Sequence, residues 1–370
     1  MRVSAVELLR LELDLRFPLR TSAGEHANRP LLLIRIRTAE GAAGIGECSA
    51  LAEPTYTEEY ADGAEAVLRD HLIPRLLAHG GPVSAAEGVR RLDDVRGHAM
   101  AKAGLEMALL DAELTETGES LASFLGVRRT SIPAGANVSL GSPSSVTSQV
   151  KGVVADGYRR VKIKIGPGAD IAVVRAVRDA FPDVALSADA NGAYDLGREE
   201  HRAALLALDA FGLTCLEQPL APGELVASAE LCAMLETPVI LDESIVRRSD
   251  FETAVALSAL DGVSIKPARL GGLITAKAVH DRARELGLSC SIGGMLESGV
   301  GRAAAIALGA LSGFDLPGDL GASDRYFVPD LTAPHVLVDG ELLVPDGAGL
   351  GVQVDEETLA RWTVRAERFE

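Results

Sequence analysis

The first part of the chain has a strand-like pattern of apolar and polar residues. The two runs are VSAVELLRLELDL at residues 3–15 and RPLLLIRIRTAEGAAGIGECSAL at residues 29–51, the second with a Glu-Gly turn. Such runs predict an antiparallel meander. From residue 57 to residue 126 the apolar positions recur with a helical period, and Gly118 lies where a helix is expected to end. Residues 1–128 are therefore expected to form an α+β module.

After Arg129 short apolar segments alternate with amphipathic helical segments. The expected strands recur about every 25 residues, as in a parallel barrel. They are IPAGANVSL, YRRVKIKI, ALSADAN, LTCLEQP, PVILDES, GVSIKPA and LSCSIGG. Residues 129–324 are thus predicted to form an α/β fold, a (β/α)7β TIM-like barrel. Residues 325–370 contain the hairpin-like stretch HVLVDGELLVPDGAGLGVQV and a short helix, which we expect to pack back on the N-terminal module.

Composition excludes several classes of protein. The 370 residues are 47% hydrophobic and 24% charged, which is ordinary for a globular protein. No apolar run reaches the roughly 18 residues needed to cross a bilayer, and the N-terminus lacks a secretory signal, so we expect a cytoplasmic protein without a membrane partner. A formal net charge of -17 argues against nucleic acid as a partner. The four cysteines form no CxxC pair and are expected to be reduced and mostly buried.

Two lysines lie on one face of the expected strand YRRVKIKI. Side chains alternate across a strand, so Lys162 and Lys164 share one face and the apolar residues share the other. If the apolar face meets the outer helices, both ammonium groups point into the barrel, where burial and mutual repulsion lower the pKa of a lysine. Such a lysine can act as a general base. The alternative is an exposed edge strand with solvated lysines.

Three acidic residues recur one repeat apart, each late in an expected strand. Asp189, Glu217 and Asp242 are separated by 28 and 25 residues. The carboxyl ends of parallel barrel strands meet at one mouth, where three carboxylates repel one another unless a cation neutralises them. Ligands that are all oxygen favour Mg²⁺ or Mn²⁺ over zinc. A single acid at a strand end is often a helix cap, but three in register favour a metal site.

Lys266 follows at a gap of 24 residues and is expected across the mouth from Lys164, unless it is a surface residue before Pro267. A metal that holds a substrate carboxylate between two opposed lysines can stabilise the enolate formed when the α-proton leaves. Candidates for the substrate pocket lie at other strand ends or near Lys266. They are Ser139, Asn191, Gly293, Gly294, Met295 and Arg269. The two glycines also fit a tight turn, and Arg269 could pair with a neighbouring acid.

Several motifs resemble those of the enolase superfamily. They are VKIKIGPG, ADANGAYDL, CLEQPL, LDESI, SIKPARLGG, GGMLESGVGRA and LPGDLGASDRYF, with PLRTSAGE, GIGECSALAEPTY and GHAMAKAGLEMALLD in the N-terminal part. The chain is most similar to the o-succinylbenzoate synthase and N-succinylamino acid racemase branch of the muconate-lactonizing subgroup. The resemblance runs nearly end to end. It implies that residues 1–128 form a capping domain whose loops at 19–24 and 49–56 close over the barrel mouth.

The resemblance also implies roles for the candidate residues. Asp189, Glu217 and Asp242 would bind Mg²⁺, Lys164 and Lys266 would flank a small, succinyl-bearing carboxylate substrate, and Lys162 would tune Lys164. In the synthase reaction Lys164 removes the α-proton and hydroxide is expelled, giving o-succinylbenzoate for menaquinone biosynthesis. In the racemase reaction the lysine that does not remove the proton returns one. Members of the family often assemble symmetrically, so a homo-oligomer is expected.

Other functions use parts of the same pattern. A dipeptide epimerase is expected to carry a DxD motif, which FDLPGDLGASDRYF does not contain. Muconate cycloisomerase shares the metal and lysine set. A Schiff-base barrel would use one lysine as a covalent nucleophile and need no metal. A non-catalytic barrel scaffold would not need intact acids and lysines.

Overall fold

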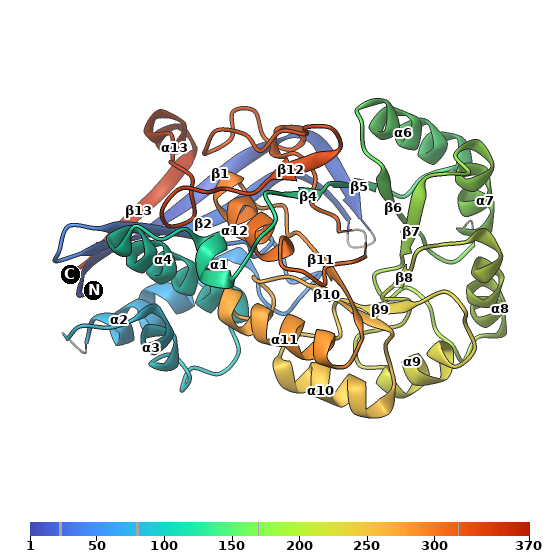
Figure 1. The fold of residues 1–370 in the computed structure, drawn as a ribbon, viewed down its shortest axis with the longest axis horizontal. Helices are drawn as coiled ribbons and strands as arrows, with labels where there is room; N and C mark the ends of the chain where they lie inside the picture. Colours follow the sequence, from blue (N-terminus) through green and yellow to red (C-terminus); the bar gives the residue numbers. More distant parts are fainter. Residues whose placement is uncertain (22–23, 79–80, 169, 317) are drawn as a thin grey trace.

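The computed structural model describes residues 1–21, 24–78, 81–168, 170–316 and 318–370, with side chains described outside residues 17–27. An antiparallel sheet with its own helices lies beside a curved parallel sheet that is ringed by helices (Figure 1). The expected mouth loop at 19–24 includes residues 22 and 23, which are outside the described residues, as are all of its side chains.

The antiparallel sheet has four strands in the order β13-β1-β2-β3. They are β1 (Val3–Thr21), β2 (Gly24–Thr38), β3 (Ala43–Cys48) and β13 (Thr363–Phe369). Neighbouring strands all run antiparallel, so the predicted meander is confirmed. Leu31, Leu33 and Ile36 of the inner strand β2 are fully buried, because this strand is paired on both sides and covered by helices.

The helices of this module follow β3 in the chain. They are α1 (Ala61–Val67), a π-helical turn (Leu68–Leu72), α2 (Ile73–Leu77), α3 (Ala85–Arg90), α4 (Ala99–Thr117) and α5 (Leu121–Leu125). The longest helix, α4, ends at Gly118, whose φ of 72° is left-handed. A glycine adopts this conformation without steric cost, and the predicted helix end is confirmed.

Two glycines of β3 let α4 lie directly against the sheet. A Cβ atom on Gly44 would lie 2.2 Å from the carbonyl oxygen of Ala108, and one on Gly46 would lie 2.1 Å from that of Gly104. No side chain fits between the two backbones at these positions. The close contact fixes α4, whose Glu106 accepts the backbone amides of Leu273 and Ile274.

The second sheet has seven parallel strands in the order β11-β10-β9-β8-β7-β6-β5. They are β5 (Gly135–Val138), β6 (Arg160–Lys164), β7 (Ala185–Asp189), β8 (Leu216–Glu217), β9 (Val239–Leu241), β10 (Gly262–Ile265) and β11 (Ser289–Ile292). Each of the seven strands predicted from the sequence is present.

Helices separate these strands along the chain and form the outer ring (Figure 1). They are α6 (Pro143–Ala155), α7 (Asp170–Ala180), α8 (Glu199–Leu208), α9 (Leu225–Cys232), α10 (Arg248–Leu257), α11 (Leu273–Glu285) and α12 (Gly299–Gly309). The apolar face of each strand packs on this ring: Val161 and Ile163 of β6 are fully buried. The alternative of an exposed edge strand for the lysine-bearing segment is therefore wrong.

The chain after α12 bridges the two edge strands of the parallel sheet. The amide of Asp319 donates to the carbonyl of Ile292, the last residue of β11, and the amide of Gly135 in β5 donates to the carbonyl of Leu320, both at 3.1 Å. This segment thus occupies the eighth position of a barrel. The predicted TIM-like barrel with a separate α+β module is confirmed.

The C-terminal segment differs in detail from the expectation. The hairpin-like stretch is reduced to one bridge between Val338 and Glu341, and β12 (Glu341–Leu343) pairs instead with β4 (Ser131–Pro133). The expected short helix is α13 (Glu356–Trp362), but β13 follows it and pairs with β1. The strand TVRAERF was missed because it is a mostly exposed edge strand without an apolar pattern. The division at residues 128 and 324 stays a prediction.

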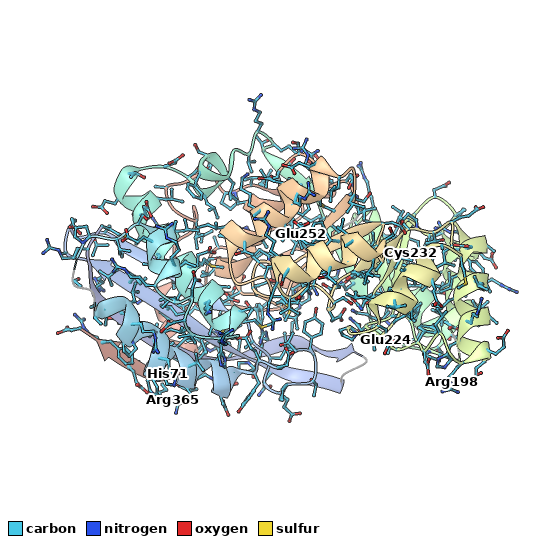
Figure 2. All side chains as sticks on the ribbon, turned by 90° about the horizontal axis from the view of Figure 1, so that it is seen from below. His71, Arg198, Glu224, Cys232, Glu252 and Arg365 are labelled. Carbon is cyan, nitrogen blue, oxygen red and sulfur yellow. The ribbon has the colours of Figure 1, made fainter. Side chains whose placement is uncertain are left out.

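None of the described helices is long and apolar enough to span a membrane. All four cysteines are unpaired, and Cys48, Cys215 and Cys290 are buried. Cys232 is partly exposed on α9, at the end of the molecule far from His71 and Arg365 of the N-terminal module (Figure 2). The expectation of reduced, mostly buried thiols agrees with this arrangement.

Because β3 and α4 are in close contact, we expect that adding one methyl group at Gly46 strongly lowers the stability of the fold. Gly46→Ala would force the helix away from the sheet, and overpacking of this kind costs about 2 kcal/mol of unfolding free energy or more. Gly152→Ala is the matched control, because nothing lies within 4 Å of its Cβ position and alanine favours a helix. Urea unfolding of both variants measures the difference. Equal stabilities would contradict the proposed packing constraint.

Candidate active site

The candidate lysines and acids lie together at the carboxyl ends of the barrel strands. Lys162 and Lys164 are on β6, Asp189 ends β7 and Glu217 ends β8. Strand register places Lys164 opposite Asp189 and Asp189 opposite Glu217. Asp242 and Lys266 directly follow β9 and β10. The residues come together because equal positions in successive repeats reach the same mouth of a barrel.

Lys162 is the cation at the centre of the acidic group. Its Nζ lies 3.1 Å from Asp189 Oδ2, 2.8 Å from Glu217 Oε1 and 3.0 Å from Asp319 Oδ2. Burial lowers the pKa of Lys162, but the three carboxylates raise it more, so the pKa lies well above the ordinary lysine value. The sequence-based expectation of a lowered pKa does not hold for this lysine, because the attraction of the carboxylates was not counted.

Lys164 lies nearer the solvent and contacts the next strand. Its Nζ donates to Asp189 Oδ2 at 2.6 Å and to Asn191 Oδ1 at 2.7 Å. Asn191 in turn donates from Nδ2 to Glu243 Oε1 at 2.7 Å. The backbone of Asn191 has a φ of 43°, a left-handed conformation that asparagine tolerates better than most residues. Asn191 thus connects one lysine to a fourth carboxylate.

Lys266 has a different set of partners. Its Nζ donates to Asp242 Oδ2 at 2.8 Å and to the hydroxyl of Tyr56 at 2.7 Å. Arg269 also donates to the Tyr56 hydroxyl, at 3.0 Å, and pairs with Asp242 Oδ1. The Tyr56 hydroxyl donates to Asp242 Oδ2 at 2.9 Å. Tyr56 comes from the loop after β3, so the N-terminal module reaches into the barrel mouth.

The two lysines approach the acids from opposite walls of the barrel. Four steps separate β6 from β10 in the strand order, and the segment around Asp319 fills the eighth position. Strands four positions apart in an eight-position barrel face each other. Lys164 and Lys266 therefore stand across the mouth from one another, with Asp189, Glu217 and Asp242 on the strands between them.

The described mouth contains more carboxylates than cations. The carboxylates are Asp189, Glu217, Asp242, Glu243 and Asp319, and the cations are Lys162, Lys164, Lys266 and Arg269. Burial and the neighbouring carboxylates raise the pKa of Glu217 to about 8 and that of Glu243 to about 7. Glu243 Oε2 is buried without a hydrogen-bond partner. An excess of buried anionic oxygens is the environment that a hard divalent cation neutralises.

The described residues contain no group of three or more acidic, histidine or cysteine side chains already arranged around a cation position. The carboxylate oxygens of the mouth face the lysine ammonium groups instead. Asp189, Glu217 and Asp242 are each at most 3% exposed, and all offer oxygen. The donor set therefore fits Mg²⁺ or Mn²⁺ in chemistry, with small side-chain rotations needed to turn oxygens from the lysines to a cation.

Comparisons with known proteins identify the family. The model of the mandelate racemase and muconate lactonizing enzyme N-terminal domain matches residues 5–126. The model of the enolase C-terminal domain-like family matches residues 145–358. The chain belongs to the mandelate racemase and muconate lactonizing enzyme family. The resemblance to the enolase superfamily is thus confirmed, and the N-terminal module corresponds to the capping domain of this family of enzymes.

Several known proteins are similar to this chain over almost their whole length. An N-succinylamino acid racemase from Amycolatopsis is 46% identical over 98% of this chain and 99% of that protein. An o-succinylbenzoate synthase from Geobacillus stearothermophilus is 41% identical over 99% of this chain and 97% of that protein. A crystal structure of an enolase superfamily member from Listeria innocua has a TM-score of 0.95 at 36% identity, covering 100% and 99% of the two chains.

The residues predicted to line the substrate pocket border the barrel mouth in this enzyme. Ser139 follows β5, and Met295 is 5% exposed. Gly293 packs against Lys266, because a Cβ atom there would lie 2.6 Å from Lys266 Cε. The amide of Gly294 donates to Asp319 Oδ1 at 2.6 Å. Neither glycine has a positive φ, so close approach explains them better than the tight turn considered from the sequence.

Three residues in contact with the candidate site were not identified from the sequence. Asp319 was missed because the segment FDLPGDL has no strand pattern. Glu243 stands beside Asp242, and nothing in the sequence pattern indicated that both acids belong to the site. Tyr56 lies in a loop that the resemblance placed over the mouth, but only its contact with Lys266 distinguishes it from the other loop residues.

Loss of the central cation is expected to destabilise the fold. Lys162→Met would leave three buried carboxylates without their shared partner, and breaking a buried ion pair costs about 3 kcal/mol or more. Lys151→Met, on the exposed surface of α6, is the control. Urea unfolding in the presence of a chelator measures both. A loss below about 1 kcal/mol for Lys162→Met would show that the carboxylates do not depend on this lysine.

Proposed function

We propose that the protein is an o-succinylbenzoate synthase that also racemises N-succinylamino acids. The observation that carries this proposal is the pair of opposed lysines, Lys164 and Lys266, on either side of a buried, oxygen-rich acidic group. The names of the relatives from Geobacillus and Amycolatopsis support the two reactions. The substrate class is a small carboxylate with a succinyl group, and the synthase product would serve menaquinone biosynthesis.

Asp189, Glu217 and Asp242 would hold Mg²⁺, or Mn²⁺ in its place. The cation would stabilise the negative charge that develops on the substrate carboxylate as the α-proton leaves. The pocket would be lined by Ser139, Asn191, Gly293, Gly294 and Met295. The surrounding carboxylates and Lys162 keep the site charged but nearly balanced, which limits the cost of burying it.

Lys164 would remove the α-proton of the substrate. Its Nζ contacts Asp189 and Asn191, which orient the ammonium group toward the strands between the two lysines. Lys162 lies two residues earlier on the same strand and shares Asp189 with Lys164, so the two lysines are coupled through one carboxylate. These contacts support the roles of general base and tuning residue for the two lysines.

The two reactions make different demands on Lys266. In the dehydration, Lys164 takes the proton and hydroxide leaves from the neighbouring carbon, so Lys266 needs only to remain positively charged. In the racemisation, Lys266 must give a proton in one direction and take one in the other. Burial and the positive charge of Arg269 lower the pKa of Lys266, but its acidic neighbours, Asp242 first, raise the pKa more, so it lies above the ordinary lysine value. Arg269 shares Asp242 and Tyr56 with Lys266.

The proposal is tested with Mg²⁺-dependent turnover. Dehydration of 2-succinyl-6-hydroxy-2,4-cyclohexadiene-1-carboxylate is followed by absorbance, with and without chelator, and racemisation of an N-succinylamino acid is followed by optical rotation. We expect Lys164→Ala to lose both activities by at least about 10³-fold while Mg²⁺ binding, measured by calorimetry, remains. Lys151→Ala is the surface control. If dehydration is absent but racemisation is present, the protein is a racemase only. If both activities are absent, a cycloisomerase is favoured.

Replacement of Arg269 is expected to separate the two reactions. Arg269→Met removes a charge that lowers the pKa of Lys266, so Lys266 would hold its proton more tightly and fail as a base. Racemisation should fall about tenfold more than dehydration, because only racemisation requires Lys266 to act as a base. Steady-state kinetics of both reactions in the same preparation measure the ratio. Equal losses would refute a special role of Arg269 in racemisation.

A further inference from the structure

Two carboxylates of the capping domain reach across to helices of the barrel. Glu106 of α4 is 1% exposed, and its carboxylate accepts the amides of Leu273 and Ile274, the first two residues of α11. Glu47 of β3 is also 1% exposed. Carboxylates in these positions satisfy amides that a helix leaves unpaired at its start.

Glu47 binds the start of α12 in the same way. Its Oε1 accepts the amide of Ser298 at 3.2 Å, and its Oε2 accepts the Ser298 hydroxyl and, at 3.2 Å, the amide of Gly301. Arg29 of β2 is a third buried link, donating to the carbonyls of Met295 at 2.9 Å and Leu296 at 3.1 Å. The capping domain thus holds the chain before and at the beginning of α12.

The backbone at Gly272 is shaped to admit Glu106. A Cβ atom at this residue would lie 1.8 Å from Glu106 Oε2, and the φ of Gly272 is 134°. A glycine with this backbone is required for the carboxylate to reach α11. The contact between Glu106 and α11 therefore depends on a glycine at position 272, at the interface between the capping domain and the barrel.

Both linked segments are joined to the surroundings of Lys266 by short stretches of chain. The turn that connects Lys266 to α11 is closed by hydrogen bonds from Leu270 N to Lys266 O at 3.1 Å and from Gly272 N to Pro267 O at 2.9 Å. On the other side Gly293, at the end of β11, packs against the Lys266 side chain. A shift of α11 or α12 would be transmitted to the Lys266 ammonium group through these short connections.

Lys164 is supported within the barrel. Its hydrogen-bond partners Asp189 and Asn191 belong to the adjacent β7 and the loop after it. The two lysines thus rest on different parts of the molecule. We infer that Glu106 and Glu47 are positioning residues for Lys266, so that the capping domain sets one acid-base group of the reaction while the barrel itself sets the other. The inference rests on the proposed function, because it concerns the two lysines of that reaction.

The test measures proton exchange by each lysine separately. Wild-type protein with Mg²⁺ is incubated in D₂O with each enantiomer of N-succinylphenylalanine, and loss of the α-proton is followed by proton NMR. Lys266→Ala identifies the enantiomer whose proton Lys164 removes, since that enantiomer alone continues to exchange. Lys164→Ala identifies the other. The two initial rates then report on the two lysines in any further variant.

Glu106→Ala is expected to lower the Lys266-dependent exchange at least about tenfold more than the Lys164-dependent exchange, since small displacements of an acid-base group are costly. Glu106→Gln retains one oxygen acceptor and should show the same asymmetry to a lesser degree, which keeps the test available if the alanine variant folds poorly. Glu113→Ala is the matched control, because Glu113 is also on α4 but binds the amide of Ala85 within the capping domain.

Each outcome bears on the inference. Selective loss of Lys266-dependent exchange in both Glu106 variants, with equal rates in Glu113→Ala, supports it. Equal losses for the two enantiomers, or no loss, would overturn it while the proposed function stands. Absence of exchange with the wild-type protein would overturn the racemase part of the proposed function, and the inference with it.

Discussion

Charge balance at the barrel mouth is the constraint on which the rest of the structure depends. Asp189, Glu217 and Asp319 all contact the Nζ of Lys162, which is almost fully buried. Separating any of these groups from its partners would leave a charge in a medium that solvates it poorly. The strands that carry them must therefore keep their register, and the irregular segment with Asp319 must close the barrel.

The arrangement of strands explains how opposed groups arise from a repeated unit. Each βα repeat contributes one functional side chain at the same height, so neighbours along the chain become neighbours around the rim. Acids on three successive strands lie between the lysines on the strands before and after them, which face each other across the mouth. The capping domain contributes Tyr56, whose hydroxyl contacts Lys266. The barrel mouth is therefore formed by residues from both modules.

Much of this could be predicted from the sequence because it depends on local periodicity. The seven strands, the shared face of Lys162 and Lys164, and the spacing of the acids follow from patterns of two and about 25 residues. Asp319 and Tyr56 could not be found in this way, because they lie in segments without a repeating pattern and meet the site only in the folded chain. The direction of the pKa shift of Lys162 depends on its distances to three carboxylates, which cannot be read from the spacing of residues in the sequence. The strand β13 was not predicted because its sequence is mostly exposed and lacks an apolar pattern.

The pairing of β13 with β1 has a consequence for the order of assembly. Val6 lies opposite Phe369, so the sheet of the capping domain acquires its outer strand from a segment that is synthesised after the whole barrel. The entropic cost of closing this loop rises by about 0.6 kcal/mol for each doubling of its length, and a barrel formed in between would shorten the effective loop. On the ribosome, three strands of this sheet would emerge before the barrel and the fourth after it, so the barrel would form between the two parts of the capping domain.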